Sequence, residues 1–287
     1  MRRATGDFLR VLLLWFAAVA LAPADLLAWG REGHRIIAAI AESRLDDGAW
    51  RNARELVGAD GLREIANWAD EIRKDRPETA PWHYVNIPRE ATAYEHDRDC
   101  VIPREGDCVV AAIERFRVIL ADRRHARADR VEALKFLTHL VADVHQPLHC
   151  ISDHEGGTTF EVVFFGEPIN SFTGKPWNLH AIWDTGLLER TGISEEEHIQ
   201  MLRAWIERQS IAELKKGTAR TWARESHRIA METVYHLLED RQIGASYLRE
   251  VLPVLDQQLA KAGLRLATIL NDALNQRSGL SAPRTAP

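Results

Sequence analysis

The sequence has no excess of basic residues. Its 37 lysines and arginines are outnumbered by 42 aspartates and glutamates, which gives a net charge of -5 at pH 7. A protein that binds any phosphate backbone without sequence preference usually carries a strong positive excess. The charge balance therefore excludes nucleic-acid binding over the whole surface and leaves room only for a local site.

The sequence also lacks internal repeats, low-complexity stretches and a linker that would divide it into two domains. Hydrophobic residues make up 46% of the 287 residues, and charged residues make up 28%. A chain of this length and composition can bury a sizeable core, which excludes a disordered chain, a collagen-like repeat and a coiled-coil rod. We expect one globular domain.

Only one long hydrophobic run is present, and it lies close to the start of the sequence. It covers residues 11–22, follows three arginines and is too short to cross a membrane comfortably as a helix. These features are typical of a secretory signal peptide over residues 1–28, cleaved after Ala28. Because no second run suggests a membrane anchor, we expect a secreted or periplasmic protein with a domain over 29–275 and a flexible tail over 276–287.

Cysteine is rare, with three residues in the chain. Cys100 and Cys108 flank a loop that contains proline and glycine, and an oxidising compartment would allow them to form a disulfide. Cys150 is then left over, and we interpret it as a buried thiol that packs beside a structural element.

Most of the remaining sequence has the periodicity of helices. Apolar residues recur every three or four positions in five segments, and a long final helix follows Pro253. The predicted helices are 33–44, 109–121, 130–145, 195–215, 218–239 and 255–274. Strand character is confined mainly to Thr158–Phe165, which follows a Gly-Gly turn signal and predicts one short β-hairpin. The predicted fold class is all-α, as a mainly helical single domain.

Two segments carry a histidine and an aspartate four positions apart. They are His139 with Asp143, and His180 with Asp184. On a helix, side chains at this spacing leave from one face and can reach a common ion. One such pair is more often a solvated surface pair, but two pairs in one chain favour metal binding.

Four further residues are candidate ligands. His149 follows Pro147, which should end the helix and turn this imidazole toward a neighbouring ion. His83 lies in a segment predicted to be extended, Asp70 on the helix before it, and His34 near the start of the first helix. Taken alone, each has a structural explanation as a core histidine, a surface charge or a polar residue at a helix end.

The combination is more specific than its parts. The patches offer imidazole and carboxylate without cysteine, a ligand set that suits zinc as a catalyst better than zinc as a structural clip. Three divalent ions would also create a local positive excess in an acidic protein. We expect such a site to attract phosphate.

Seven motifs occur in an order and spacing that resemble a known family. They are WGxxGH, WADxIR, HYVN, THLxxDxHQPLH, GG, NLHxxWD and QLAKAGLRLAxxLN, and they run from Trp29 to Asn271. The sequence resembles the S1/P1 nuclease family, the secreted zinc-dependent single-strand nucleases. This resemblance implies a mostly helical, phospholipase C-like fold, three zinc ions, and cleavage of RNA and single-stranded DNA to 5′-phosphorylated products. It also implies 3′-nucleotidase activity on 3′-nucleotides, and no protein partner.

The resemblance also implies the ligands of the three zinc ions. The first ion would be bound by Asp70, His83, His139 and Asp143. The second would be bound by Asp143, His34 and the free amine and carbonyl of Trp29. The third would be bound by His149, His180 and Asp184. Only a cut directly before Trp29 supplies the amine, so signal cleavage would be part of the catalytic design.

Catalytic roles follow from the same resemblance. Asp70 and Asp143 would act through the ions they hold, and Arg73 would contact the scissile phosphate. A hydroxide between two zinc ions is a nucleophile near neutral pH, and the third ion would stabilise the departing 3′-oxygen. His145 does not share a helical face with Asp143, so we interpret it as a packing or supporting residue.

A base pocket is implied around Tyr84 and Asn86. Tyr84 would stack on a base, an interaction that tolerates every base at ~1 to 3 kcal/mol each, and the Asn86 amide would contact a base edge. The competing structural explanation is that Tyr84 is an ordinary aromatic residue of the core. Many fungal and plant relatives have Asp in place of Asn86 and often Asn in place of Thr158, so these two departures concern base selectivity.

Two other functions compete with this interpretation. A zinc-dependent phospholipase C has a similar fold and three-metal site, but its last ligand is typically Glu, where this sequence has Asp184. A secreted zinc-binding protein without catalysis would use the same clusters for storage, but storage needs neither a bridging carboxylate nor a free amine.

Overall fold

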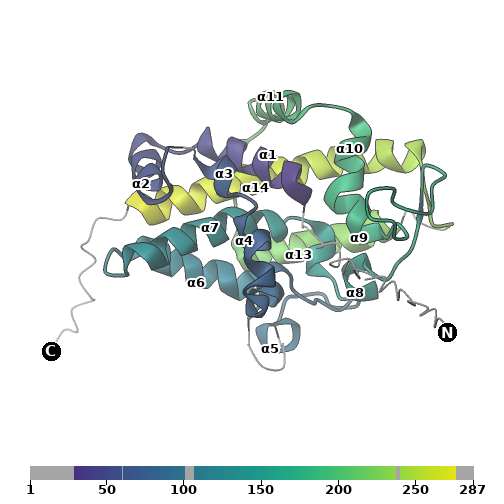
Figure 1. The fold of residues 1–287 in the computed structure, drawn as a ribbon, viewed down its shortest axis with the longest axis horizontal. Coiled ribbons are helices and arrows are strands. Elements are labelled where there is room, and N and C mark those ends of the chain that lie inside the picture. The colour runs from purple at the N-terminus through teal and green to yellow at the C-terminus, as the bar shows by residue number, and fades with distance from the viewer. Residues whose placement is uncertain (1–28, 60, 101–106, 237–239, 276–287) are drawn as a thin grey trace, which may run out of the picture.

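The longest helix, α14 (Ala245–Asn275), crosses the molecule, and α1 (Gly30–Glu42) packs along it (Figure 1). The computed structural model describes residues 29–59, 61–100, 107–236 and 240–275. The predicted signal peptide over 1–28 and the predicted tail over 276–287 lie outside the described residues.

Helices α6 (Val109–Ala121) and α7 (Arg127–Asp143) lie side by side, and both pack against α14 (Figure 1). The second half of α7 is buried on all sides, from Phe136 to Asp143. This burial explains why α7 carries apolar residues around its whole circumference there. It also means that polar groups at this end of α7 lie inside the protein.

Shorter elements surround these four helices. The other α-helices are α2 (Asp47–Val57), α3 (Leu62–Ile65), α4 (Trp68–Glu71), α5 (His96–Asp99), α8 (His154–Gly157), α9 (Leu179–Ala181), α10 (Leu187–Thr191), α11 (Glu195–Ile206), α12 (Ile211–Leu214) and α13 (Ala219–Ile229). The 3₁₀ segments are η1 (Ile72–Lys74), η2 (Pro77–His83) and η3 (Pro147–Cys150), and the π-helical segments are η4 (Ile182–Gly186) and η5 (Ala230–Tyr235). The mainly helical fold class is thus confirmed.

Two predicted helices differ from the structure by more than a few residues. The predicted helix over 195–215 is interrupted between α11 and α12, because 207–210 is an exposed polar stretch without an apolar face to bury. The final helix begins at Ala245, ten residues earlier than predicted, and contains Pro253 in its interior. Burial of Tyr247 and Val251 in the core offsets the hydrogen bond that the proline removes.

The predicted extended segment around His83 is partly wrong. His83 is the last residue of the 3₁₀ segment η2, and the chain becomes extended only from Tyr84. Pro77 and Pro81 both lie in this 3₁₀ segment, whose short hydrogen-bonded turns tolerate them.

The predicted β-hairpin is wrong in its pairing. Strand β1 (Val163–Phe164) pairs in parallel with β2 (Gln242–Ile243), the short segment that precedes α14. The left-handed backbone of Phe165, at φ 49°, and of Gly166, at φ 85°, ends the strand after two residues. Antiparallel pairing in this part of the described chain is limited to isolated bridges, which join Glu161 to Asn178, Phe164 to Glu167, and Ile169 to Pro176.

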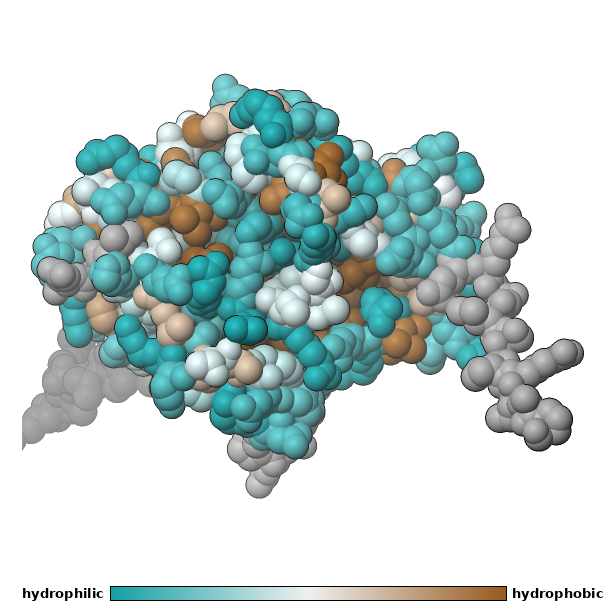
Figure 2. Space-filling model, turned by 180° about the vertical axis from the view of Figure 1, so that it is seen from behind, coloured by the Kyte–Doolittle hydropathy of each residue, from teal (hydrophilic) through white to brown (hydrophobic). Residues whose placement is uncertain are grey.

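Buried apolar residues from the described elements form one continuous cluster. Figure 2 shows, from the side opposite to Figure 1, hydrophobic residues in small separate patches on a mostly hydrophilic surface. Among the described residues, none of the helices has the length and apolar character that crossing a bilayer would require.

The crossing of α1 and α14 depends on Gly263. A Cβ atom at this position would lie 2.5 Å from Ile40 Cγ2 and 3.1 Å from the carbonyl oxygen of Ile37. We expect Gly263→Ala to lower the free energy of unfolding by about 1–3 kcal/mol, because the added methyl forces the two helices apart. Chemical denaturation measures the effect.

Gly244→Ala is the matched control, since a Cβ there would meet no atom within 4 Å. This variant should unfold at the same denaturant concentration as the unmodified protein. Equal stability of the two variants would contradict the role given to Gly263.

Candidate metal centre and substrate cavity

The buried end of α7 presents His139 and Asp143 on the same side, one helical turn apart. Asp143 Oδ2 lies 3.4 Å from His139 Nε2, and neither side chain is exposed. His139 Nδ1 is 2.7 Å from the carbonyl oxygen of Ala66, so it donates there and leaves Nε2 as the atom that faces the site. The four-residue spacing therefore has the geometry predicted for it.

The carboxylate of Asp143 faces two groups of side chains at once. Its Oδ1 lies 3.1 Å from Nε2 of His34, and its Oδ2 lies 2.9 Å from Nδ1 of His83. These two histidines come from α1 and from the end of η2, which are far apart in sequence. The arrangement gives Asp143 the position that a bridging ligand would need.

Asp70, His83 and His139 form the first group. Asp70, on α4, places Oδ2 3.5 Å from His139 Nε2 and Oδ1 3.7 Å from His83 Nδ1. Ligand atoms of the three residues lie within 4.8 Å of one another. A single ion could therefore reach one atom of each residue.

His34, His139 and Asp143 form the second group. The ring of His34 stacks on that of His139, with the centroids 3.9 Å apart. His34 Nδ1 lies 2.9 Å from the carbonyl oxygen of Gly30, which directs Nε2 toward Asp143. Trp29 is fully buried beside this group, and its indole Nε1 donates to the carbonyl oxygen of Ala142.

His149, His180 and Asp184 form the third group. His180 Nε2 is 3.2 Å from Asp184 Oδ2, and His149 Nε2 is 4.0 Å from Asp184 Oδ1. The Nδ1 atom of His149 is 2.7 Å from the carbonyl oxygen of His83, a ligand candidate of the first group. Pro147 begins η3 after α7 has ended, which turns His149 away from the α7 axis as predicted.

Sequence reasoning missed Gln146. Its side-chain Nε2 donates to Asp184 Oδ1 at 2.6 Å, and its Oε1 accepts from the backbone N–H of Leu148. Gln146 thus holds the carboxylate of the third group in place. The only signal in the sequence is a glutamine between two histidines in a segment that proves to be fully buried.

Several buried polar atoms of these groups have no hydrogen-bond partner among the described residues. They are Asp70 Oδ2, His83 Nε2, His139 Nε2, His149 Nε2 and Asp184 Oδ2. Buried polar atoms are almost always satisfied, and leaving one without a partner costs about 1–3 kcal/mol. All of these atoms except His83 Nε2 point toward the other ligand atoms of their group. The residues therefore fit metal ions bound between them.

The pKa shifts of His139, His149 and Asp143 suit metal ligands, whereas the neighbouring aspartates raise the pKa of His34 and of His180 against the effect of burial. Burial lowers the pKa of His149 to about 4 and the pKa of His139 well below its ordinary value, so both imidazoles are neutral. Burial raises the pKa of Asp70 to about 6. Burial also opposes the ionisation of Asp143, but the surrounding imidazoles outweigh it and hold the pKa of Asp143 well below the usual range. Neutral imidazoles and an ionised carboxylate are the forms that bind a cation.

A cavity of about 480 Å³ opens beside the groups. Its walls include His83, His149 and His180. The three predicted substrate residues, Arg73, Tyr84 and Asn86, also line this cavity, and so does Thr158, a position expected to bear on base selectivity. The structure therefore brings the metal groups and the predicted base and phosphate contacts to one place.

Tyr84 and Asn86 form a shelf at the cavity, because Val85 and Ile87 between and after them point into the core. The N–H of Val85 donates to the carbonyl oxygen of His149 at 2.8 Å. Tyr84 is 36% exposed and lines the cavity, so it is not the core aromatic of the competing explanation.

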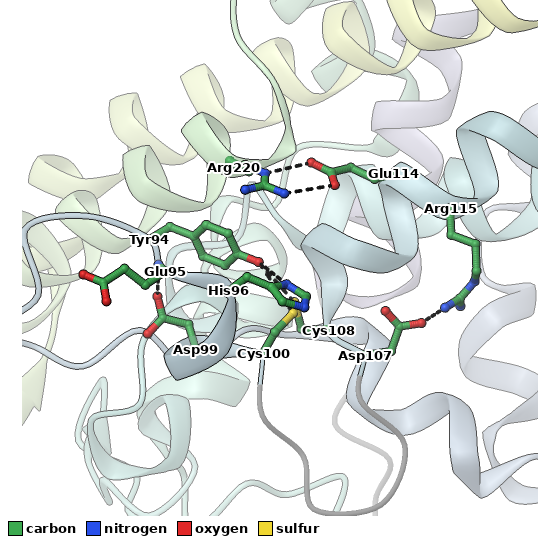
Figure 3. The surroundings of a disulfide bond; sticks show 10 residues. All are labelled: Tyr94, Glu95, His96, Asp99, Cys100, Asp107, Cys108, Glu114, Arg115 and Arg220. Atoms are coloured by element: carbon green, nitrogen blue, oxygen red, sulfur yellow. Dashed lines mark hydrogen bonds and ion pairs between the residues drawn. A yellow bond between two sulfur atoms is a disulfide. The ribbon is translucent and has the colours of Figure 1, made fainter.

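The predicted disulfide between Cys100 and Cys108 is confirmed, with the two Cα atoms 5.1 Å apart (Figure 3). Next to the two cysteines, the carbonyl oxygen of Asp99 accepts from Asn86 N–H, and Val109 N–H donates to Tyr84. The disulfide therefore joins the two segments that hold the shelf formed by Tyr84 and Asn86.

The remaining predicted residues lie as follows. Arg73 places a guanidinium nitrogen 3.2 Å from Asp70 Oδ1 at the edge of the cavity. Both ring nitrogens of His145 are engaged away from the three groups, by the carbonyl oxygen of Val141 and by a guanidinium nitrogen of Arg265 at 2.8 Å, which agrees with a packing or supporting residue. Cys150 is a fully buried free thiol, as expected, and burial raises its pKa.

Comparisons with known proteins agree with this geometry. The sequence model of the family described as S1/P1 Nuclease matches residues 29–275. Endonuclease 2 of Arabidopsis thaliana is 30% identical over 272 residues, covering 86% of this chain and 91% of that protein. Nuclease S1 of Aspergillus oryzae is 28% identical over 296 residues, covering 93% of this chain and 99% of that protein. Nuclease P1 of Penicillium citrinum is 26% identical over 274 residues, covering 85% of this chain and 97% of that protein.

Proposed function

The chain belongs to the S1/P1 nuclease family, and from this premise we propose that it is a zinc-dependent enzyme that cleaves RNA and single-stranded DNA to 5′-phosphorylated products. It is a nuclease, a hydrolase of phosphodiester bonds in nucleic acids. We also propose that it removes the phosphate from 3′-nucleotides. The observation that carries the proposal is that three buried His/Asp groups lie together and that residues of two of them, His83, His149 and His180, line one cavity.

The proposed ligand sets follow the three groups. Asp70, His83, His139 and Asp143 would hold one zinc ion. Asp143, His34 and the N-terminal amine and carbonyl of Trp29 would hold a second, and His149, His180 and Asp184 a third. When bound, zinc lowers the pKa of water toward neutrality and polarises phosphoryl oxygens.

The chain's own residues would position the substrate around these groups. The Arg73 guanidinium, at the cavity edge, is suited to orient a phosphate oxygen, because its planar fork matches that group. Tyr84 would stack on the neighbouring base. The hydrogen bond from His149 Nδ1 to the backbone of His83 would keep the first and third groups at a constant separation.

Location and processing belong to the same proposal. We propose a secreted or periplasmic enzyme whose signal peptide is removed directly before Trp29. The new amine would then complete the second group, at the buried N-terminal end of α1.

A comparison of substrates tests the function. The mature, zinc-loaded protein should cleave single-stranded DNA and RNA, release phosphate from 3′-nucleotides, and lose these activities when a chelator removes the metal. Gel assays and phosphate release measure the outcome. Release of diglyceride from phosphatidylcholine without cleavage of nucleic acid would instead support the phospholipase C alternative.

One extra residue before Trp29 tests the amine ligand and the storage alternative together. We expect at least a tenfold to hundredfold loss of activity, roughly what disturbing a metal site costs, because the amine becomes an amide. Circular dichroism should show unchanged helix content. Full activity in the extended protein would remove Trp29 from the ligand set. Zinc binding without activity in the correctly cut protein would favour storage.

A further inference from the structure

The cavity beside the metal groups carries a carboxylate that those groups do not use. Glu155 lines the cavity together with Tyr84, Asn86 and Thr158. It is exposed, and within the described ranges its carboxylate has no hydrogen-bond or ion-pair partner. An unpaired carboxylate at the wall of a cavity for a phosphorylated substrate needs an explanation, because it repels phosphate.

The backbone holds Glu155 in an unusual conformation. His154, Glu155 and Gly156 have φ values of 48°, 53° and 65°, in the left-handed region that residues with a Cβ rarely adopt. Two contacts fix this turn. The carbonyl oxygen of Gly156 lies 2.7 Å from His180 Nδ1, and the hydroxyl of Tyr235 donates to the carbonyl oxygen of Asp153. Glu155 is therefore tied to a residue of the third metal group.

The same turn is also tied to the shelf formed by Tyr84 and Asn86. The N–H of Ser152 donates to the carbonyl oxygen of Ile87 at 3.0 Å, and the N–H of Glu155 donates to that of Ser152 at 3.1 Å. Backbone hydrogen bonds thus join the segments that carry Glu155 and Asn86 into one rim of the cavity. A base stacked on Tyr84 would present its edge to this rim, while its phosphate would lie toward Arg73 and the metal groups.

The two side chains offer a specific set of hydrogen-bonding atoms. A carboxylate provides two acceptors, and the amide of Asn86 provides a donor. Guanine alone among the four bases has two adjacent N–H donors beside a carbonyl acceptor on its pairing edge. Adenine and cytosine place ring-nitrogen acceptors where the carboxylate would need donors, and uracil has a single N–H.

We infer that this cavity selects guanine, with Glu155 accepting from its two N–H groups and Asn86 donating to its carbonyl oxygen. The inference rests on the proposed function, and it names guanosine 3′-phosphates as the preferred substrate class. Glu155 acts here as a specificity residue for the base and takes no part in the hydrolytic step. The carboxylate faces the base edge, which explains why a negative charge is tolerated beside a phosphate site.

Kinetics with single nucleotides test the inference. The mature, zinc-loaded protein should hydrolyse guanosine 3′-monophosphate with a kcat/KM at least about tenfold above that for adenosine 3′-monophosphate. Inosine 3′-monophosphate, which lacks the amino group, should fall between the two. Glu155→Gln should lower kcat/KM for the guanosine substrate about tenfold and leave the adenosine substrate within about threefold, because only guanine uses both carboxylate oxygens.

Glu167→Gln is the matched control, since Glu167 is also exposed but does not line the cavity. It should keep the guanosine-to-adenosine ratio, and both variants should keep the zinc content of the unmodified protein. The inference is wrong if the unmodified protein shows no preference for guanosine, or if Glu155→Gln leaves the ratio unchanged.

Failure of the proposed function has a different signature, which is no hydrolysis of any nucleotide. In that case, calorimetric binding of guanosine 5′-monophosphate and adenosine 5′-monophosphate decides the matter. Tighter guanosine binding that Glu155→Gln abolishes would still support the inference. Equal affinities for the two nucleotides would overturn it.

Discussion

The carboxylate of Asp143 is the group on which the rest of the site depends. It is fully buried at the end of α7, between imidazoles that come from α1 and from η2. A buried charge is costly unless partners of opposite charge surround it, and removal of one partner leaves the cost uncompensated. Asp143 therefore links three distant segments of the chain through one electrostatic requirement, and that requirement is best met by cations on both sides of it.

Helix packing supplies the rigidity that this arrangement needs. The close contact between α1 and α14 at Gly263 sets the position of α1, and with it the position of His34. Backbone carbonyl groups then orient four of the five candidate imidazoles, because His34, His139, His149 and His180 each have Nδ1 against one, whereas Nδ1 of His83 faces Asp143. The same device leaves Nε2 directed at a carboxylate in every case. The fold thus determines tautomer and direction before any ion arrives.

Sequence patterns predict the parts of this site that depend on local geometry. Residues four apart on a helix meet, so His139 with Asp143 and His180 with Asp184 could be found directly. Their assembly with His34, Asp70 and His83 needed the family resemblance, since no periodicity reports contacts between distant segments. The roles of Gln146 and Glu155 were not predicted from the sequence for a related reason. Their roles depend on a neighbour far along the chain and on a left-handed turn, and the strand β2 that pairs with β1 was missed because it comes from a distant segment.

The zinc content of purified mature protein and of two aspartate variants tests the central position of Asp143 most directly. The unmodified protein should contain three equivalents, and Asp184→Asn should lose one because its carboxylate faces a single group. Asp143→Asn should lose two, because its oxygens face two groups. Asp256→Asn, which alters a His–Asp pair outside the three groups, should lose none. If Asp143→Asn retained as much zinc as Asp184→Asn, or if the unmodified protein held one ion or fewer, the account would be contradicted.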